Sequence, residues 1–351
     1  MHGRLLTIAL LLFSQIVHSS GETPLFASDE LLKAVLSAPI SQAYKQKKQE
    51  KRLYLDGSWS YRQADEEPVR LTVKIRTRGN FRKETCSLPP LQLNFKKKEV
   101  KSTLFAGQDK IKMVSPCKRM DKYQQYVYLE YLIYKLFALI SEHHFKTRLV
   151  EVAYNDANGK AKPWQSTNFL IEDVADMAAR SGLEPADIVS SKRSQMDLGQ
   201  TALVEVFQFM IGNVDYSTLK AAEGEKCCHN IKLLVPEGEQ SGWTPVAYDF
   251  DVSGLINAAY APLPAKVPIK KVTDRYFTGW CKEEKRFRDA ISHINGKREA
   301  AVALFVNFSL MEEKYRKRGV KYLEKSYDKL NDEYYVENYI LGRCRGEVIK
   351  G

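Results

Sequence analysis

The sequence lacks most of the short motifs by which common enzyme classes are recognised. It contains no G-x-G-x-x-G phosphate loop, no G-x-S-x-G nucleophile elbow and no H-E-x-x-H zinc motif. No C-x-x-C pair is present, so a structural zinc site would lack its usual ligand spacing. No pair of carboxylates has the character of a glycosidase site. These absences argue against several hydrolase classes and against zinc-stabilised domains.

Long apolar runs are also missing. After residue 20, no segment approaches the ~20 apolar residues that a membrane-spanning helix requires. The first twenty residues carry Arg4, an apolar run over residues 5–13 and the small residues Ser19 and Ser20, as in a cleaved signal peptide. An uncleaved N-terminal anchor is the less favoured alternative. We therefore expect an exported protein, either periplasmic or secreted.

The rest of the chain has no low-complexity tract, internal repeat or long flexible linker. The full sequence is 44% hydrophobic and 28% charged, a composition able to bury a large core. At this length, we expect one large domain or two closely packed lobes. The sequence does not indicate an oligomeric state.

Cysteines are few but even in number. Six cysteines in a chain predicted to be exported favour disulfides over free thiols. Cys86 and Cys117 flank two consecutive predicted strands, so we expect them to pair. We expect one of Cys227 and Cys228 to pair with Cys281. A metal site built on the two adjacent cysteines is the less favoured alternative, because neighbouring residues chelate one tetrahedral ion poorly.

Acidic residues are outnumbered, and the formal net charge is +11. The simplest interpretation is a solvated basic surface. A more specific one is attraction to an anionic partner such as nucleotide phosphates, an envelope phospholipid surface or an acidic protein. Nucleic acid is not expected as a partner, because no recognisable nucleic-acid-binding motif is present.

Polar residues with the chemistry of phosphoryl transfer are gathered in residues 212–254. Asp215 follows an apolar helical run, Asn230 precedes an apolar strand, and Asp249 and Asp251 follow a second short strand. Phosphoryl transfer needs a carboxylate to orient the attacking hydroxyl, and an amide and a carboxylate to hold Mg²⁺ on the nucleotide. The order of these residues along the chain fits that set.

The pattern Asn213-x-Asp215, His229-Asn230 and Asp249-x-Asp251 resembles that of the spore-coat kinase family CotH and, more distantly, HipA-type atypical kinases. The segment between Asp215 and Asn230 is longer here than in those families. The resemblance implies an ATP-dependent kinase with Asp215 as the base. It also implies Mg²⁺, or alternatively Mn²⁺, held by Asn230 and Asp249, with Asp251 as a ligand of a second ion.

Periodicity predicts the elements of this fold. Residues 28–36 predict a short helix with Ser28 as its N-cap. Apolar residues at alternate positions predict strands and a hairpin. Apolar residues every three or four positions predict a long helix and three later helices. The strands are expected at 53–61, 69–78, 91–97, 110–115, 147–154 and 167–174, and the helices at 122–141, 282–294, 297–317 and 319–341.

Together with the resemblance, these elements predict an α+β fold of the bilobal protein-kinase type. Residues 1–20 form the signal peptide. Residues 21–172 form an N-terminal β-rich lobe with an antiparallel sheet and one long helix. Residues 173–351 form a mainly helical C-terminal lobe that carries the catalytic loop and the metal-binding acids.

One predicted strand ends in the run from Arg76 to Asn80, which resembles the Arg-Gly-Asn/Ser signature of CotH proteins. Gly79 would let the backbone approach a ligand closely, and Arg78 could reach phosphate oxygens. An ordinary hairpin turn with exposed arginines is an equally good interpretation of these residues alone.

A kinase usually places a lysine on a central strand opposite a glutamate on the next helix. Lys110 and Lys112 share one face of a predicted strand, and Glu130 lies in an apolar helix, where a carboxylate needs a cationic partner. We expect Lys112 to pair with Glu130. The alternative places Glu130 on a polar helix face and Lys112 in solvent.

Residues 169–172 resemble the segment that joins the two lobes in this family, where Glu172 would lie near the nucleobase. A plain surface acid at a strand end is the alternative for Glu172.

Two functions follow from the sequence. The first is an exported kinase that transfers the γ-phosphoryl group of ATP to a hydroxyl of a protein or small molecule. The second is a catalytically inactive, pseudokinase-like envelope protein that binds a nucleotide or an anionic partner.

Overall fold

The computed structural model describes residues 23–63, 67–221 and 226–349. The predicted signal peptide, residues 1–20, lies outside the described residues. Within the described ranges, no helix is both long enough and apolar enough to cross a membrane.

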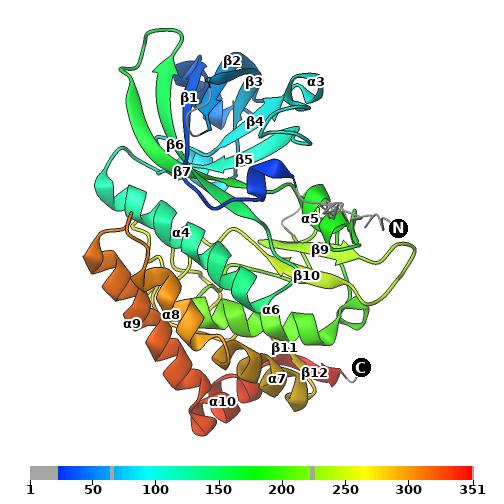
Figure 1. The fold of residues 1–351 in the computed structure, drawn as a ribbon. Coiled ribbons are helices and arrows are strands. Elements are labelled where there is room, and N and C mark those ends of the chain that lie inside the picture. Colours follow the sequence, from blue (N-terminus) through cyan, green and yellow to red (C-terminus); the bar gives the residue numbers. More distant parts are fainter. Residues whose placement is uncertain (1–22, 64–66, 222–225, 350–351) are drawn as a thin grey trace, which may run out of the picture.

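Seven strands of the first half of the chain close into a barrel, which lies at the top of Figure 1. The order around the barrel is β1-β2-β3-β4-β5-β7-β6, and β6 returns to β1. The pair β1–β6 is parallel, and every other neighbouring pair is antiparallel. The strands are β1 (Leu32–Ala38), β2 (Leu55–Arg62), β3 (Val69–Thr77), β4 (Leu91–Phe95), β5 (Lys110–Val114), β6 (Thr147–Asp156) and β7 (Trp164–Ile171).

This closed barrel contradicts the predicted fold class. A bilobal protein-kinase-like fold has an open antiparallel sheet in its N-terminal lobe, whereas here the two ends of the sheet are joined through β1 and β6. Alternation along a strand shows which face is buried, but not whether the outer strands meet. The predicted boundary between lobes at residue 172 follows the end of β7 and stays a prediction.

The strand that closes the barrel was predicted as a helix. Residues 28–36 include Leu, Ala and Lys, which favour helices, but Leu32–Ala38 forms β1. Along β1 the side chains of Leu32, Ala34, Leu36 and Ala38 are buried in alternation with more exposed neighbours. Pairing on both sides, with β2 and β6, overrides the local helix preference.

Aromatic side chains fill the interior of the barrel. Trp59 of β2 is fully buried, and its ring meets those of Phe95 and Phe105 at centroid distances of 6.3 and 6.0 Å. These edge-on contacts suit the uneven charge distribution of aromatic rings. The barrel therefore has a packed core of its own.

The long helix α4 (Asp121–Ile140) matches the prediction for residues 122–141 and runs between the barrel and the helices below it (Figure 1). Buried side chains occur on nearly every face of α4, as expected for a helix that is covered on several sides. The other helices are α1 (Ile40–Lys45), α2 (Phe81–Thr85), α3 (Lys97–Val100), α5 (Val174–Arg180), α6 (Leu198–Ile211), α7 (Glu284–Asn295), α8 (Arg298–Val306), α9 (Glu313–Leu330) and α10 (Glu333–Tyr339).

Two small sheets complete the lower part. One has the order β10-β9-β8, and the other pairs β11 with β12. Their strands are β8 (Glu184–Pro185), β9 (Ile231–Val235), β10 (Thr244–Ala247), β11 (Trp280–Lys282) and β12 (Arg345–Ile349). The helix predicted over residues 297–317 is divided at a turn after Val306, so that its second part belongs to α9.

All six cysteines are paired. The predicted bond between Cys86 and Cys117 is confirmed. The predicted bond from Cys227 or Cys228 to Cys281 is wrong, because the first two pair with each other and Cys281 pairs with Cys344. Parallel pairing of β11 with β12 brings Cys281 and Cys344 together. Three disulfides favour a non-reducing environment.

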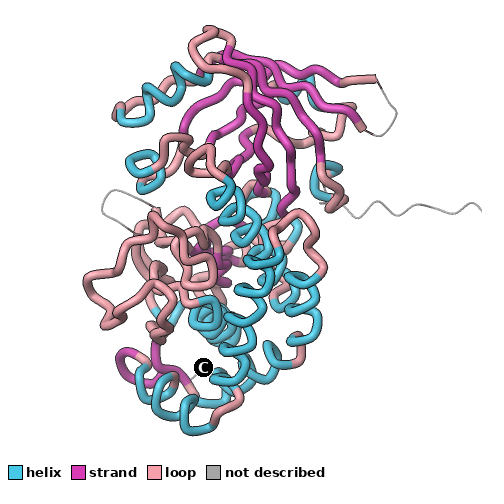
Figure 2. The backbone as a smooth tube through the Cα atoms, turned by 90° about the vertical axis from the view of Figure 1, so that its left-hand side faces the viewer, coloured by secondary structure: helices cyan, strands magenta, loops and turns pink. Residues whose placement is uncertain are grey.

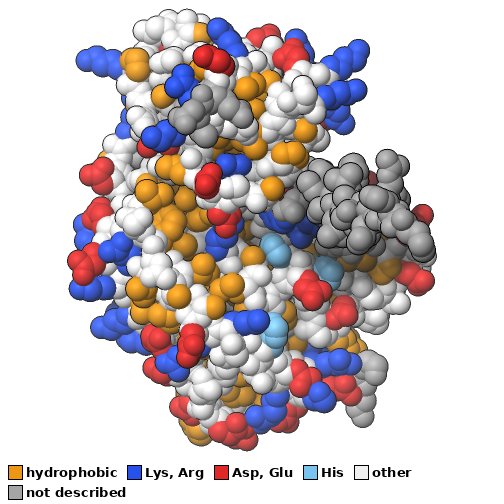
Figure 3. All heavy atoms as spheres, viewed as in Figure 1, with side chains coloured by type: hydrophobic (Ala, Val, Ile, Leu, Met, Phe, Trp, Pro, Cys, Tyr) orange, Lys and Arg blue, Asp and Glu red, His pale blue; other side chains and the backbone are white. Residues whose placement is uncertain are grey.

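Basic side chains do not form one continuous patch on the face shown in Figure 3. Lys and Arg are interspersed there with Asp and Glu. On that face, the charge excess therefore looks like an ordinary solvated surface.

We expect peptide mapping of the oxidised protein to recover the pairs Cys86–Cys117, Cys227–Cys228 and Cys281–Cys344. Thiol titration under denaturing, non-reducing conditions should find no free thiol. A peptide that links Cys281 to Cys227 or Cys228 would contradict this arrangement.

Candidate active site

A cavity of about 550 Å³ lies where the lower end of the barrel meets the loops of the small sheet. Its wall includes residues 78–82 from the barrel side, Glu130 and Tyr134 of α4, and residues 212–215, 228–230 and Lys232. Figure 2 shows loops gathered on one side of the lower part, opposite the long helices. Segments far apart in the sequence therefore meet in one concave site.

The loop that carries Asp215 begins at the end of α6. Gly212 ends this helix in a left-handed conformation (φ 66°), where a side chain would collide with the hydroxyl of Tyr322. The buried amide of Asn213 donates to Gln208 Oε1 (3.0 Å) and accepts from the backbone N–H of Asp215 (3.1 Å). These bonds fix the path of the loop after α6 and so the position of Asp215.

Both carboxylate oxygens of Asp215 have a partner. His229 Nε2 lies 2.7 Å from Oδ1, and Asn230 Nδ2 donates to Oδ2 at 3.0 Å and to the Asp215 carbonyl at 2.7 Å. The side chain of Asp215 nevertheless remains 47% exposed, and that of His229 42%. Asp215 is thus held in place but open to the cavity. His229 was not among the predicted site residues, although it stands next to Asn230 in the recognised pattern.

The hairpin of β9 and β10 brings Asn230 and Asp249 to the same end of the small sheet. Ile231, the first residue of β9, pairs with Ala247, the last residue of β10. The backbone N–H of Tyr248 donates to the Asn230 carbonyl (3.2 Å). Asn230 and Asp249 both have positive φ (51° and 62°), a conformation that non-glycine residues adopt rarely and that is found preferentially at functional sites.

Asp251 and Glu130 share one cation, Arg82. Its Nη1 lies 3.9 Å from Glu130 Oε2, and its Nε lies 3.8 Å from Asp251 Oδ2. All three residues are at least nine-tenths buried and line the cavity. Burial, and then the negative charge of Asp249, raise the pKa of Asp251 to about 7. Burial and the charge of Asp251 raise the pKa of Glu130 well above its usual range.

The predicted Lys112–Glu130 pair is therefore not formed. The choice of Lys112 rested on the Lys–Glu geometry usual in kinases, and the sequence could not show that α2 places Arg82 beside Glu130. Lys112 Nζ instead lies 5.4 Å from the ring centre of Tyr248 and 5.9 Å from that of Phe145. Burial, together with the positive charges of Arg78 and Lys232, lowers the pKa of Lys112 to about 7.

Arg78 and Gly79 line the cavity, and their predicted role in binding a nucleotide stays a prediction. The chain leaves β3 at this point, and Gly79 has φ 83°, which suits a residue without a side chain. Arg52 supports the turn by donating to the carbonyls of Thr77 (3.1 Å) and Gly79 (3.4 Å).

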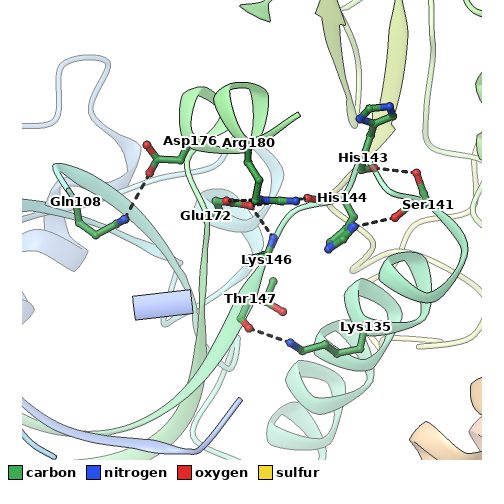
Figure 4. Close-up of polar contacts among 10 residues, drawn as sticks. All are labelled: Gln108, Lys135, Ser141, His143, His144, Lys146, Thr147, Glu172, Asp176 and Arg180. Carbon is green, nitrogen blue, oxygen red and sulfur yellow. Dashed lines mark hydrogen bonds and ion pairs between the residues drawn. The ribbon is translucent and has the colours of Figure 1, made fainter. Parts of the chain in front are cut away.

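Glu172 is not brought together with the other predicted residues. It does not line the cavity, and its carboxylate accepts from Arg180 (2.8 and 3.2 Å) and from the Lys146 backbone N–H (2.9 Å). Figure 4 shows Arg180 of α5 directed at Glu172 and at the segment that carries His144. Glu172 thus fastens α5 to the segment before β6, and its predicted place near a nucleobase stays a prediction.

The predicted metal ligands Asn230, Asp249 and Asp251 all line the cavity. Within the described ranges, no group of three or more His, Cys, Asp or Glu side chains is close enough to hold a metal ion without rearrangement. The donor set still suits a hard cation, because it offers carboxylate and amide oxygens. The oxygen Oδ2 of Asp251 is buried and has no hydrogen-bond partner in the described part of the chain.

Comparison with known proteins adds no family assignment. No protein-family model matches the chain, and no curated protein shows significant similarity to it. The resemblance to CotH-type kinases stays a prediction that rests on the residues quoted above.

We expect the ammonium group of Lys112 to titrate near pH 7, as followed by NMR of methyl-labelled lysines. An ordinary lysine in an unfolded chain titrates near pH 10.4. Between those values the unfolded chain binds the proton and the folded one does not, so the contribution of Lys112 to stability rises with pH. It is constant below about pH 7.

The variant Lys112→Met should lack this titration and should flatten that part of the stability profile. A lysine signal near pH 7 that persists in Lys112→Met would show that another residue is responsible.

Proposed function

We propose that this chain is an exported, ATP-dependent phosphotransferase that transfers the γ-phosphoryl group to a hydroxyl acceptor. The observation that supports this function best is the convergence of Asp215, Asn230 and Asp249 in one cavity whose wall also carries Arg78 and Lys232. Acidic and amide oxygens suit a metal ion, and the cations suit phosphate oxygens. Phosphoryl transfer relies on both kinds of group.

Asp215 is proposed to accept the proton of the attacking hydroxyl. Its bonds to His229 and Asn230 fix the orientation of the carboxylate, while its exposed half leaves room for an acceptor. As the acceptor oxygen forms its bond to the γ-phosphorus, its proton passes to Asp215. The bond from phosphorus to the leaving oxygen of ADP then breaks, and the charge remains on ADP.

Asn230 and Asp249 are proposed to hold Mg²⁺, with Mn²⁺ as an alternative, and Asp251 is proposed as a ligand of a second ion. When bound, the ion would neutralise charge on the nucleotide phosphates. Asp249 follows the end of β10, and its backbone N–H donates to the hydroxyl of Tyr134 (2.9 Å), so its position is fixed by both the hairpin and α4. A rigid ligand loses little freedom on binding an ion.

Arg78, Lys112 and Lys232 are proposed to neutralise the phosphate groups. Arg78 and Lys232 line the cavity, and burial, followed by the positive charges of both, lowers the pKa of Lys112. An anionic nucleotide beside these cations should favour protonated Lys112. We therefore expect Lys112 to take up a proton more readily when the nucleotide is bound than when the cavity holds only water.

Export is part of the proposal. Three disulfides suit an oxidising compartment, and the N-terminal residues resemble a signal peptide. The acceptor would then be an exported protein or a small molecule, and an anionic envelope surface is a further proposed contact.

Two variants separate the proposed roles. Asp215→Asn should leave binding of the Mg²⁺–nucleotide near the parental value and reduce turnover by roughly a hundredfold or more, the scale for a general base. Asp249→Asn should weaken Mg²⁺-dependent nucleotide binding itself, because a hard cation prefers an anionic oxygen. Calorimetry and a phosphotransfer assay measure the two effects.

Asp289→Asn is a matched control, because Asp289 is an exposed residue of α7 that pairs with Lys285. It should match the parent in both measurements. Nucleotide binding without turnover in the parent would favour the non-catalytic alternative. Parental binding and turnover in both active-site variants would contradict the assignment of this cavity.

A further inference from the structure

Arg82 stands out because it is a buried arginine without a complete set of partners. It lies in α2, and only 8% of its surface is exposed. One guanidinium nitrogen, Nη2, donates to the carbonyl of Ser115. Its Nε has no hydrogen-bond partner within the described ranges, although a buried donor of this kind is costly to leave unpaired.

The ion-pair partners of this guanidinium are two carboxylate groups of the cavity wall. Asp251 Oδ2 lies 3.8 Å from Nε, and Glu130 Oε2 lies 3.9 Å from Nη1. These are ion-pair distances, and both are longer than a hydrogen bond. Asp251 Oδ2 also lacks a hydrogen-bond partner among the described residues. Arg82 and Asp251 thus form an ion pair but no hydrogen bond.

Charge explains why this arrangement matters for the site. Glu130 and Asp251 are both buried, and Arg82 is the only cation recorded in an ion pair with either of them in the described part of the chain. Removing one partner of a buried ion pair is strongly destabilising, because it leaves a charge without compensation. Without Arg82, two neighbouring carboxylates would repel each other beside the proposed metal ligand Asp249.

We propose that Arg82 is a positioning residue that holds Asp251, through their ion pair, in the orientation needed to receive the metal–nucleotide complex. Arg82 would act through Asp251 and Glu130 without touching the acceptor. This inference rests on the proposed function, because it assumes that Asp251 faces a cation when the site is loaded.

The Cys86–Cys117 disulfide supports this role for Arg82. Cys86 follows α2, and its backbone N–H donates to the carbonyl of Arg82 (2.9 Å). The disulfide joins the residue after α2 to the segment after β5, and the bond from Arg82 to Ser115 joins α2 itself to the same segment. Two links to one segment therefore limit the movement of α2 and of its guanidinium.

The test compares Arg82→Met with the double variant Arg82→Met/Glu130→Gln. Thermal unfolding without ligand measures stability, and calorimetry with ATP and Mg²⁺ measures binding. Arg82→Met should unfold at a lower temperature and should bind at least tenfold more weakly. The double variant removes the carboxylate repulsion, so it should regain most of the lost thermal stability but should still bind at least tenfold more weakly.

Arg148→Met is the matched control. Arg148 is buried to a similar extent, 6% exposed, and donates to the carbonyls of Leu25 and Glu30 away from the cavity. It should lower thermal stability and leave Mg²⁺-dependent binding near the parental value. Recovery of both stability and binding in the double variant would overturn the proposal, because Arg82 would then be only a structural counter-charge.

Arg82→Lys keeps the inference testable if Arg82→Met fails to fold. A lysine retains the charge but has no planar fork to face two carboxylates. It should fold and bind several-fold more weakly, and parental binding would overturn the role of Arg82. A parent protein that does not bind ATP at all, with or without Mg²⁺, would instead refute the proposed function.

Discussion

The hydrogen bonds from His229 and Asn230 to Asp215 hold the proposed site together. They join the loop after α6 to the start of β9, and fourteen residues separate Asp215 from Asn230 in the sequence. The pairing of β9 with β10 then fixes Asp249 at the same end of the sheet. If the bonds to Asp215 were lost, the base and the metal ligands would no longer have a defined separation, which phosphoryl transfer requires.

A cluster of buried carboxyl groups is the second constraint on this site. Glu130 and Asp251 are buried around one guanidinium, and burial, followed by the charge of Asp249, raises the pKa of Asp251. Two cations, Arg78 after β3 and Lys232 of β9, line the same cavity as these acids. Burial, and then these two positive charges, lower the pKa of nearby Lys112. Such opposed perturbations are typical of functional sites.

The sequence was a better guide to which polar residues meet in one cavity than to the fold that brings them there. Asp215, Asn230 and Asp249 could be picked out because each borders an apolar segment of clear type. Barrel closure could not, because it depends on β1, whose Leu and Ala residues suit a helix equally well. The Arg82–Glu130 pair could not be predicted either, because α2 has only five residues and no periodic pattern indicates it.

Thermal unfolding measured without ligand, with ATP, with Mg²⁺ and with both tests the central claim most directly. A ligand that binds only the folded protein stabilises it by ~2.7 kcal/mol at a hundred times its dissociation constant. We predict a clear rise in unfolding temperature when ATP and Mg²⁺ are both present, and a smaller rise or none with either alone. An unfolding temperature that is the same in all four conditions would contradict a nucleotide site in this cavity.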